Sequence, residues 1–332
     1  CGVSAQTWKR CKMRDDDFSL AATGAFGRAV PDYSLANLSR WRIGGKCSLL
    51  VEPDNTDQLI GFVKAAAAGN WPYLVIGNGS NLLFSDSGFR GICLKVGERY
   101  AGVENSAELV TAHSGVWIPC LARWCASHGL SGIEHVIGIP GNLGGLLAMN
   151  GGSLRQSISE KVVRVTSLTR SGEIRVRRKD ECEFGYRSSI FRKTNEIVLT
   201  AEFELQRKNS AEIRRAMLEI LRSRREKFPL KLPNCGSVFL SDPAMYSVVG
   251  PPGKAIEQAG LKGKRIGSAE VSERHANFFV NRGGATAADM LQLIRLVQET
   301  VAVQTGFRMS TEVIYVDSAG RSMPADQVER AG

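Results

Sequence analysis

The feature that most restricts the fold is a glycine-rich turn placed directly after an apolar strand. Residues 74–76 are apolar and lead into Gly77-Asn78-Gly79-Ser80-Asn81, after which apolar residues return. Glycines in such a turn allow positive φ angles and let successive backbone N–H groups point at one anion, for which a diphosphate is suited. A glycine-rich turn without a ligand explains this motif equally well. The spacing is not that of a GxGxxG turn, and no lysine follows as in a nucleoside-triphosphate loop.

A second loop of the same kind lies further along the chain. It runs Gly138-Ile139-Pro140-Gly141-Asn142-Leu143-Gly144-Gly145 and precedes Met149-Asn150-Gly151-Gly152. Two backbone-lined loops predict one long ligand that carries a diphosphate and an aromatic ring, as a dinucleotide cofactor does. The second loop therefore favours ligand binding over an unliganded turn.

The composition is typical of a soluble globular protein. The 332 residues are 43% hydrophobic and 23% charged, which predicts two or three domains. No apolar run is long enough to cross a bilayer. Three aspartates, Asp15 to Asp17, follow the early basic residues where a secretory signal would be apolar, so we expect a cytoplasmic protein. Residues 1–30 are interpreted as a poorly specified N-terminal arm.

Cysteine spacing and charge exclude several functions. The eight cysteines show neither a CxxC pair nor a Cys/His pair at zinc spacing, so reduced thiols and no metal site are predicted. The net charge is +10, but the densest basic cluster, residues 222–227, has acids interleaved on an amphipathic helix and favours a solvated helix face. Because no nucleic-acid module is present, a polyanionic small molecule is the expected partner, with no nucleic acid and no membrane.

Hydrophobic periodicity predicts an α+β chain. Helices are expected over residues 56–70, 117–128, 211–228 and 287–304. Strands are expected over residues 74–76, 92–96, 162–169, 173–176, 196–205, 275–281 and 311–316. Residues 206–210 form a polar link.

Six motifs in order resemble one enzyme family. They are Arg42-Ile43-Gly44-Gly45, the loop 77–83, the loop 138–150, the stretch 184–191, Gly236-Ser237-Val238-Phe239, and residues 255–278. Each is weak alone, but the ordered set, which extends from about Leu38 to Val316, resembles the UDP-N-acetylenolpyruvoylglucosamine reductases, also called UDP-N-acetylmuramate dehydrogenases. Residues 192–195 lead directly into the next strand, which resembles the shorter subclass without an inserted tyrosine-bearing loop.

The resemblance implies an FAD enzyme of peptidoglycan precursor synthesis. It implies a vanillyl-alcohol-oxidase-like fold of two FAD-binding subdomains, residues 31–98 and 99–206, followed by an α+β substrate domain at 207–304. The strand within 305–320 is expected to return to the first subdomain. NADPH would reduce the flavin, which would then reduce the enolpyruvyl ether of UDP-N-acetylglucosamine to the lactyl ether of UDP-N-acetylmuramate.

The reaction places definite demands on side chains. Hydride addition at the vinyl β carbon leaves negative charge over the α carbon and the carboxylate, so donors must face that carboxylate and an acid must protonate the α carbon. By resemblance Ser237 is the proton donor and Glu312 the second catalytic residue. Arg187 can meet the carboxylate as a planar fork. Taken singly, Ser237 also fits a turn residue, Glu312 a solvent-facing strand position, and Arg187 a surface cation–π pair with Tyr186.

The remaining site predictions are binding residues. The FAD-binding set is Arg42, Ile43, Gly77, Asn78, Gly79, Ser80, Asn81, Leu82, Pro140, Gly141, Asn142, Gly144, Gly145 and Asn150. The substrate-binding set is Tyr186, Arg187, Lys254, Lys262 and Asn277, of which the lysines are nearly as well explained as solvated. His275 is interpreted as structural.

Two departures and two alternatives accompany the resemblance. Leu240-Ser241-Asp242 replaces a basic residue followed by Asn-Pro, which removes one expected contact to the uridine nucleotide or NADPH, and Asn142-Leu143 replaces a smaller pair. A flavin-linked oxidase or dehydrogenase with another substrate is the alternative within the fold, and a nucleotide-binding module without turnover is the alternative class. A monomer or weak dimer is expected.

Overall fold

Strands β2 (Lys46–Glu52) and β5 (Phe89–Lys95) form the centre of the first of three lobes. In this computed structural model, which describes residues 21–329, the first sheet has the order β1-β2-β5-β3, with β1 (Arg28–Ser34) antiparallel to β2 and β3 (Tyr73–Ile76) parallel to β5. Helix α2 (Thr56–Gly69) begins where the side chain of Asn55 accepts the Gln58 N–H and ends at Asn70, whose φ is 51°. Its buried face packs on the sheet through Phe62.

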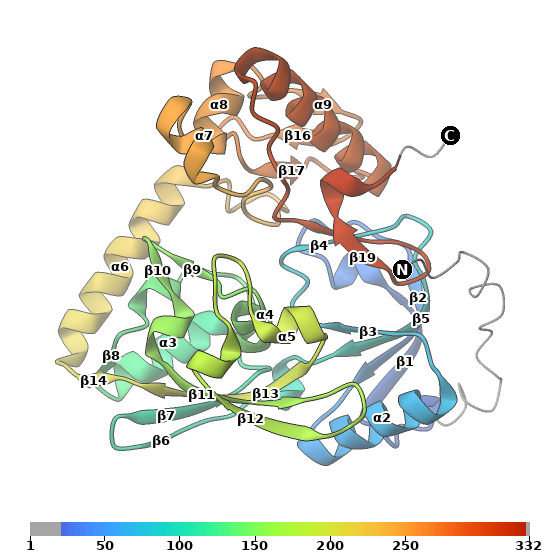
Figure 1. Cartoon of the computed structure of the whole chain (residues 1–332), viewed down its shortest axis with the longest axis vertical. Helices are drawn as coiled ribbons and strands as arrows, with labels where there is room; N and C mark the ends of the chain where they lie inside the picture. Colours follow the sequence, from blue (N-terminus) through green and yellow to red (C-terminus); the bar gives the residue numbers. More distant parts are fainter. Residues whose placement is uncertain (1–20, 330–332) are drawn as a thin grey trace.

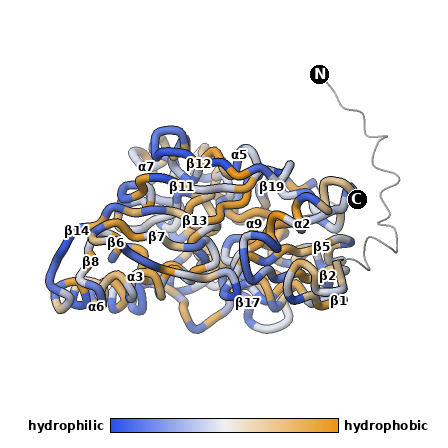
Figure 2. The backbone as a smooth tube through the Cα atoms, turned by 90° about the horizontal axis from the view of Figure 1, so that it is seen from below, coloured by the Kyte–Doolittle hydropathy of each residue, from blue (hydrophilic) through white to orange (hydrophobic). Residues whose placement is uncertain are grey.

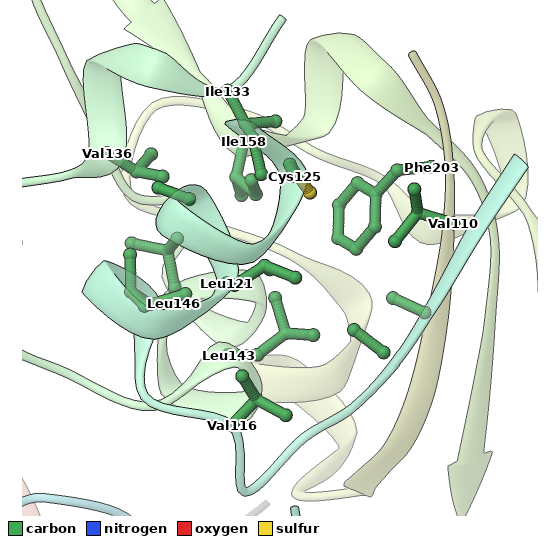
Figure 3. Close-up of a cluster of buried hydrophobic side chains, with 14 of the residues drawn as sticks. Val110, Val116, Leu121, Cys125, Ile133, Val136, Leu143, Leu146, Ile158 and Phe203 are labelled. Atoms are coloured by element: carbon green, nitrogen blue, oxygen red, sulfur yellow. The ribbon is translucent and has the colours of Figure 1, made fainter. Parts of the chain in front are cut away.

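The second lobe is a five-stranded antiparallel sheet covered by helices (Figure 1). Its order is β12-β11-β13-β7-β6, with bounds β6 (Val103–Ser106), β7 (Leu109–His113), β11 (Val162–Leu168), β12 (Ile174–Arg178) and β13 (Ile197–Glu204). Phe203 of β13 pairs in register with Val110 of β7, and Leu121 and Cys125 of α3 (Ile118–Ser127) lie over them (Figure 3). Helix α4 (Leu143–Ala148) adds Leu143 and Leu146 to this core.

Short elements complete the second lobe. They are the two-stranded pairs β9 (Gly152–Ser153) with β10 (Gln156–Ser157) and β8 (Leu130–Ser131) with β14 (Gln206–Arg207), helix α5 (Ile190–Thr194), and the 3-10 turns η3 (Glu134–Val136), η4 (Ile158–Lys161) and η5 (Asp180–Cys182).

Helix α6 (Ser210–Lys227) connects the second lobe to the third (Figure 1). The polar link that precedes it, next to β14, is hydrophilic (Figure 2), and Asn209 caps its first turn. The third lobe contains the sheet β15 (Arg265–Ile266), β16 (Ala269–Val271) and β17 (Phe279–Asn281), with α7 (Pro243–Val248), α8 (Pro252–Gln258) and α9 (Ala287–Thr305). Thr286 and Asp289 form a capping box at the start of α9.

After α9 the chain returns to the first lobe. Strand β18 (Ile314–Val316) pairs in parallel with β4 (Leu82–Phe84) and antiparallel with β19 (Ser322–Pro324), after which η6 (Ala325–Gln327) follows. The buried Trp41, in the turn after η1 (Leu35–Asn37), donates its indole N–H to the carbonyl of Phe279 at 2.7 Å. The first and third lobes are therefore held together by both strand pairing and a buried hydrogen bond.

The α+β class predicted from the sequence is confirmed, and so is each of the four predicted helices to within one or two residues. Two predicted strands are too long. Residues 275–277 lie outside any strand and Phe278 makes only an isolated bridge to Ser237, while the Ser272 hydroxyl accepts N–H groups from Arg274 and His275. Thr311 makes only an isolated bridge to Phe239, since its N–H is bound by Asp326 at 2.9 Å.

The N-terminal part of the chain is more structured than expected from residue 21 onward. Phe26 packs edge-on against Phe62 and Trp71, and β1 begins at Arg28, so part of the stretch interpreted as an arm belongs to the first lobe. Residues 1–20 lie outside the described part of the chain.

The cysteines in residues 21–329 are free thiols, namely Cys47, Cys93, Cys120, Cys125, Cys182 and Cys235. Over the same residues, no three His, Cys, Asp or Glu side chains gather as metal ligands would. None of the helices in this range is both long and apolar enough to cross a membrane.

Candidate active site

The two glycine loops predicted from the sequence lie against each other where the first two lobes meet. A Cβ placed on Gly77 would come within 3.3 Å of Asn142 Oδ1, and one on Gly141 within 3.2 Å of Ser80 Oγ. Gly79 has a φ of 54°, and a side chain there would overlap the carbonyl oxygen of Leu38. The close approach of the backbones therefore requires glycine, as inferred from the first loop.

Buried polar atoms with no hydrogen-bond partner surround these loops. Within residues 21–329 they include Asn142 Oδ1, Asn150 Oδ1 and Ser114 Oγ. Each amide is held by its other end, because Asn142 Nδ2 donates to the Gly115 carbonyl at 2.6 Å and Asn150 Nδ2 donates to the Gly185 carbonyl at 2.9 Å. An unpaired buried polar atom costs about 1–3 kcal/mol, so this set fits a ligand that brings its own donors and acceptors.

The surroundings fit FAD in particular. The glycine backbones of residues 77–79 and 141–145 can approach a diphosphate, and a Cβ on Gly145 would meet nothing within 4 Å. The flavin ring carries both donors and acceptors along its edge, as the unpaired Asn142 and Ser114 atoms require. Asn78, Leu82, Pro140 and Gly144 lie in or directly beside the same two loops.

Three residues of the predicted FAD set have surroundings that the sequence did not show. Ile43 is 2% exposed and packs in a core shared with the third lobe, so only its backbone can face a ligand. Arg42, next to it, is exposed with a φ of 58°. Asn81 is bonded within the protein, because its Nδ2 donates to the Glu312 carbonyl at 2.8 Å.

Arg224 is a residue that sequence reasoning missed. The basic cluster of α6 was expected to be a solvated face, but the Arg224 side chain packs directly on Gly138 of the second glycine loop and over the Phe228 ring, 4.9 Å from its centroid. Its Nε is buried without a hydrogen-bond partner, and burial lowers the pKa of its guanidinium. A half-buried cation with an unpaired Nε beside such a loop is suited to an anionic group of the cofactor or substrate.

The three predicted catalytic residues come together from different parts of the chain. Arg187 Nε lies 2.8 Å from Glu312 Oε1, across the gap between the second lobe and the C-terminal segment. The Glu312 N–H donates to the Val238 carbonyl at 2.8 Å, directly after Ser237, which is partly buried. The structure thus brings the Arg187–Glu312 pair together with the backbone that directly follows Ser237.

The charge state of this group is set by its surroundings. Burial raises the pKa of the Glu312 carboxyl above its ordinary value, and the neighbouring Arg187 guanidinium opposes the shift. The Arg187 Nε–H is close to the carboxylate but is not aligned on it as a hydrogen bond. The guanidinium can therefore turn toward another carboxylate without breaking an aligned bond.

A pocket of about 350 Å³ opens beside Arg187. Its lining is Asn150, Gly152, Ser153, Arg155, Gln156, Ser157, Tyr186 and Arg187. A larger groove of about 980 Å³ lies on the second sheet among Glu160, Lys161 and Arg178 and shares none of these residues. The smaller pocket contains the predicted residues Asn150, Tyr186 and Arg187, and the larger groove contains none of the predicted site residues.

The predicted substrate residues fall into three groups. Tyr186 lines the pocket, and its hydroxyl accepts the Ser241 N–H at 3.2 Å. Lys254 is exposed on α8 and Lys262 is paired with Glu257 at 2.6 Å, and neither lines the pocket. Asn277 is 5% exposed, both its amide ends bind the backbone of Phe239, and it does not line the pocket, so its role as a substrate contact stays a prediction.

His275 is a structural residue, as expected. It packs against the rings of Phe228 and Phe278, and burial lowers the pKa of its imidazole.

Two glycine loops that meet between the first two lobes, unpaired buried polar atoms beside them and a half-buried Arg–Glu pair fit the class of flavin-dependent oxidoreductases. Family models agree, since residues 47–177 match the FAD binding domain and residues 228–316 match the C-terminal domain of UDP-N-acetylenolpyruvoylglucosamine reductase. FAD as the cofactor, predicted from the two loops and the family resemblance, is thereby confirmed.

Similar proteins extend the match over most of the chain. UDP-N-acetylenolpyruvoylglucosamine reductase 1 of Corynebacterium glutamicum is 44% identical over 91% of this chain and 90% of its own length. The reductase of Heliobacterium modesticaldum is 38% identical over 89% and 92%. The crystal structure of the reductase from Thermus caldophilus superposes with a TM-score of 0.72 at 30% identity, covering 87% of this chain and 98% of that one. The chain belongs to the UDP-N-acetylenolpyruvoylglucosamine reductase family.

Alanine at position 79 should weaken flavin binding. The positive φ and the overlap with the Leu38 carbonyl force the loop to move, at a cost of about 1–3 kcal/mol. We expect Gly79→Ala to be purified with a lower ratio of flavin absorbance to protein absorbance than the wild type. Gly61→Ala in α2, where the new Cβ stays 3.4 Å from the Phe26 ring, is the matched control and should retain full flavin. Equal flavin content in both variants would contradict the assigned role of Gly79.

The free energy of unfolding should respond to pH through Glu312. Its raised pKa means that the folded chain binds this proton more tightly than the unfolded chain, so ionisation costs stability as the pH rises. The free energy of unfolding of Glu312→Gln minus that of the wild type should therefore increase between about pH 4 and pH 7. Denaturant titrations at matched flavin content measure it. If this difference is flat or falls with pH, burial is not the main influence on the pKa of the Glu312 carboxyl.

Proposed function

We propose that this chain reduces the enolpyruvyl ether of UDP-N-acetylglucosamine to UDP-N-acetylmuramate, with electrons from NADPH, in peptidoglycan precursor synthesis. The observation that carries the proposal is the meeting of Arg187, Glu312 and the Ser237 segment beside one pocket in a chain of this reductase family. An enol ether conjugated to a carboxylate needs this combination of cation, acid and carboxylate.

In this proposal each of the three residues has its own role. The Arg187 guanidinium, which lies 2.8 Å from Glu312, binds the substrate carboxylate and stabilises the negative charge that develops there. By resemblance to the family, Ser237 gives the proton to the α carbon, and Glu312, whose N–H donates to the Val238 carbonyl, polarises the developing enol. Bound FAD supplies the hydride for the vinyl β carbon.

The three lobes have separate tasks in this proposal. Residues 31–98 and 99–206 form the FAD-binding subdomains, and the C-terminal strand within 305–320 serves the first of them. Residues 207–304 form the substrate domain. Tyr186, which lines the pocket and reaches Ser241 of the third lobe, is the substrate contact best supported by the structure. We expect a cytoplasmic monomer or weak dimer.

The function is tested by a visible absorption spectrum recorded under anaerobic conditions. Purified protein should be yellow, lose its flavin absorbance on addition of NADPH, and regain it on addition of the enolpyruvyl substrate. A yellow protein that ignores this substrate would indicate an oxidase or dehydrogenase with another substrate. A colourless protein unable to take up FAD would indicate a nucleotide-binding module without turnover.

Replacing Arg187 by lysine should separate the two half-reactions. Lysine keeps the charge but loses the planar fork that binds a carboxylate through two parallel hydrogen bonds. We expect Arg187→Lys to slow reoxidation of the flavin by the enolpyruvyl substrate by about tenfold or more, while reduction by NADPH changes little. Stopped-flow absorbance resolves both rates, and Arg192→Lys, an exposed arginine bonded to the Arg187 carbonyl, is the control. Equal slowing of both half-reactions in Arg187→Lys would remove Arg187 from this role.

A further inference from the structure

Asn277 is a buried polar side chain near the proposed proton donor, with both ends of its amide bonded. It is 5% exposed, its Oδ1 accepts the Phe239 N–H at 2.9 Å, and its Nδ2 donates to the Phe239 carbonyl at 2.9 Å. Its own carbonyl accepts the Val238 N–H at 2.8 Å. Three bonds from one residue therefore fix the two residues that follow Ser237.

The segment held by Asn277 has little other regular structure. Ser237 and Phe239 take part only in isolated bridges, to Phe278 and Thr311, rather than in a continuous sheet. An isolated bridge fixes register less firmly than a ladder of several pairs, so the side-chain clamp supplies much of the constraint. The position of the Ser237 hydroxyl consequently depends on Asn277.

The same segment also carries Glu312. The Glu312 N–H donates at 2.8 Å to the carbonyl of Val238, which is one of the two residues that Asn277 holds. On its other side the Glu312 carbonyl accepts the Asn81 amide at 2.8 Å. Two buried or half-buried amides thus hold the Ser237 and Glu312 backbones in one register.

We propose that Asn277 is a positioning residue, which sets the Ser237 hydroxyl and, through Val238, the Glu312 carboxyl for protonation of the substrate's α carbon. The inference rests on the proposed function. Displacement of a reacting group by about 1 Å can cost about a hundredfold in rate, so a clamp on the backbone beside the donor is sufficient to control proton transfer. Reduction of the flavin by NADPH requires no proton from Ser237 and should not depend on the clamp.

The test compares two buried asparagines of the third lobe. Asn281 is also 5% exposed and binds backbone groups at both amide ends, but its side-chain partners are Trp41, Gly283 and Ala285, none of which belongs to the Ser237–Phe239 segment. Asn277→Ser and Asn281→Ser remove equivalent groups and should lower the midpoint of thermal unfolding to a similar extent. The two variants differ because only Asn277→Ser removes hydrogen bonds to Phe239, two residues after the proposed proton donor Ser237.

Stopped-flow absorbance on the FAD-loaded enzymes gives the decisive rates. In Asn277→Ser we expect reoxidation of the reduced flavin by the enolpyruvyl substrate to fall by about ten- to a hundredfold, with a larger solvent deuterium isotope effect, while reduction by NADPH stays within about threefold of wild type. In Asn281→Ser both rates should stay near wild type and the isotope effect should not change. A merely structural role predicts the same behaviour in both variants.

Other outcomes overturn the inference. If Asn277→Ser slows both half-reactions equally, or slows neither, Asn277 does not position the donor. Should Asn277→Ser fail to fold, Asn277→Asp, which keeps the shape and the acceptor for the Phe239 N–H, serves in its place with the same readouts. If the wild-type enzyme itself is not reoxidised by the enolpyruvyl substrate, the proposed function has failed, which is a distinguishable result.

Discussion

The return of the C-terminal segment to the first lobe is the constraint on which the active site depends. Residues 310–316 bond to the third lobe through Ser310 and Glu312 and to the first lobe through Ile314, whose N–H donates to the Asn81 carbonyl at 3.1 Å. The second lobe meets the same segment through the Arg187–Glu312 pair. One short stretch of chain therefore contacts all three lobes, and Glu312 lies at its centre.

The electrostatics of the site follow from this arrangement. Glu312 is buried because the three lobes enclose it, and burial favours its neutral form, whereas Arg187 favours the charged form. Arg187 Nε and Glu312 Oε1 lie 2.8 Å apart without an aligned hydrogen bond, so the attraction between the two side chains only partly offsets their loss of hydration. A substrate carboxylate could give the Arg187 guanidinium a partner that it meets through aligned hydrogen bonds.

Much of the fold and part of the site could be predicted from the sequence. The four main helices follow from periodicity and from caps such as Asn55 and Thr286. The approach of the two loops followed from glycines at positions such as 79, where only glycine fits. What the sequence could not show depended on side-chain partners that lie far away in sequence. The Asn81 amide binds the Glu312 carbonyl and the Asn277 amide binds the backbone of Phe239, and neither pairing leaves a periodic signal. Arg224 resembles any solvated helix arginine until Gly138 is seen beneath it.

The pairing of β4 with β18 has a consequence for the order in which the enzyme is made. A chain leaves the ribosome from its N-terminus, so β4 and the glycine loop before it emerge long before Ile314–Val316 can pair with them. Until then β4 is an unpaired strand edge, and the Asn81 amide lacks the Glu312 carbonyl. The catalytic carboxylate therefore reaches its site only when translation is nearly complete, and a truncated or nascent chain with a folded flavin cradle would lack it.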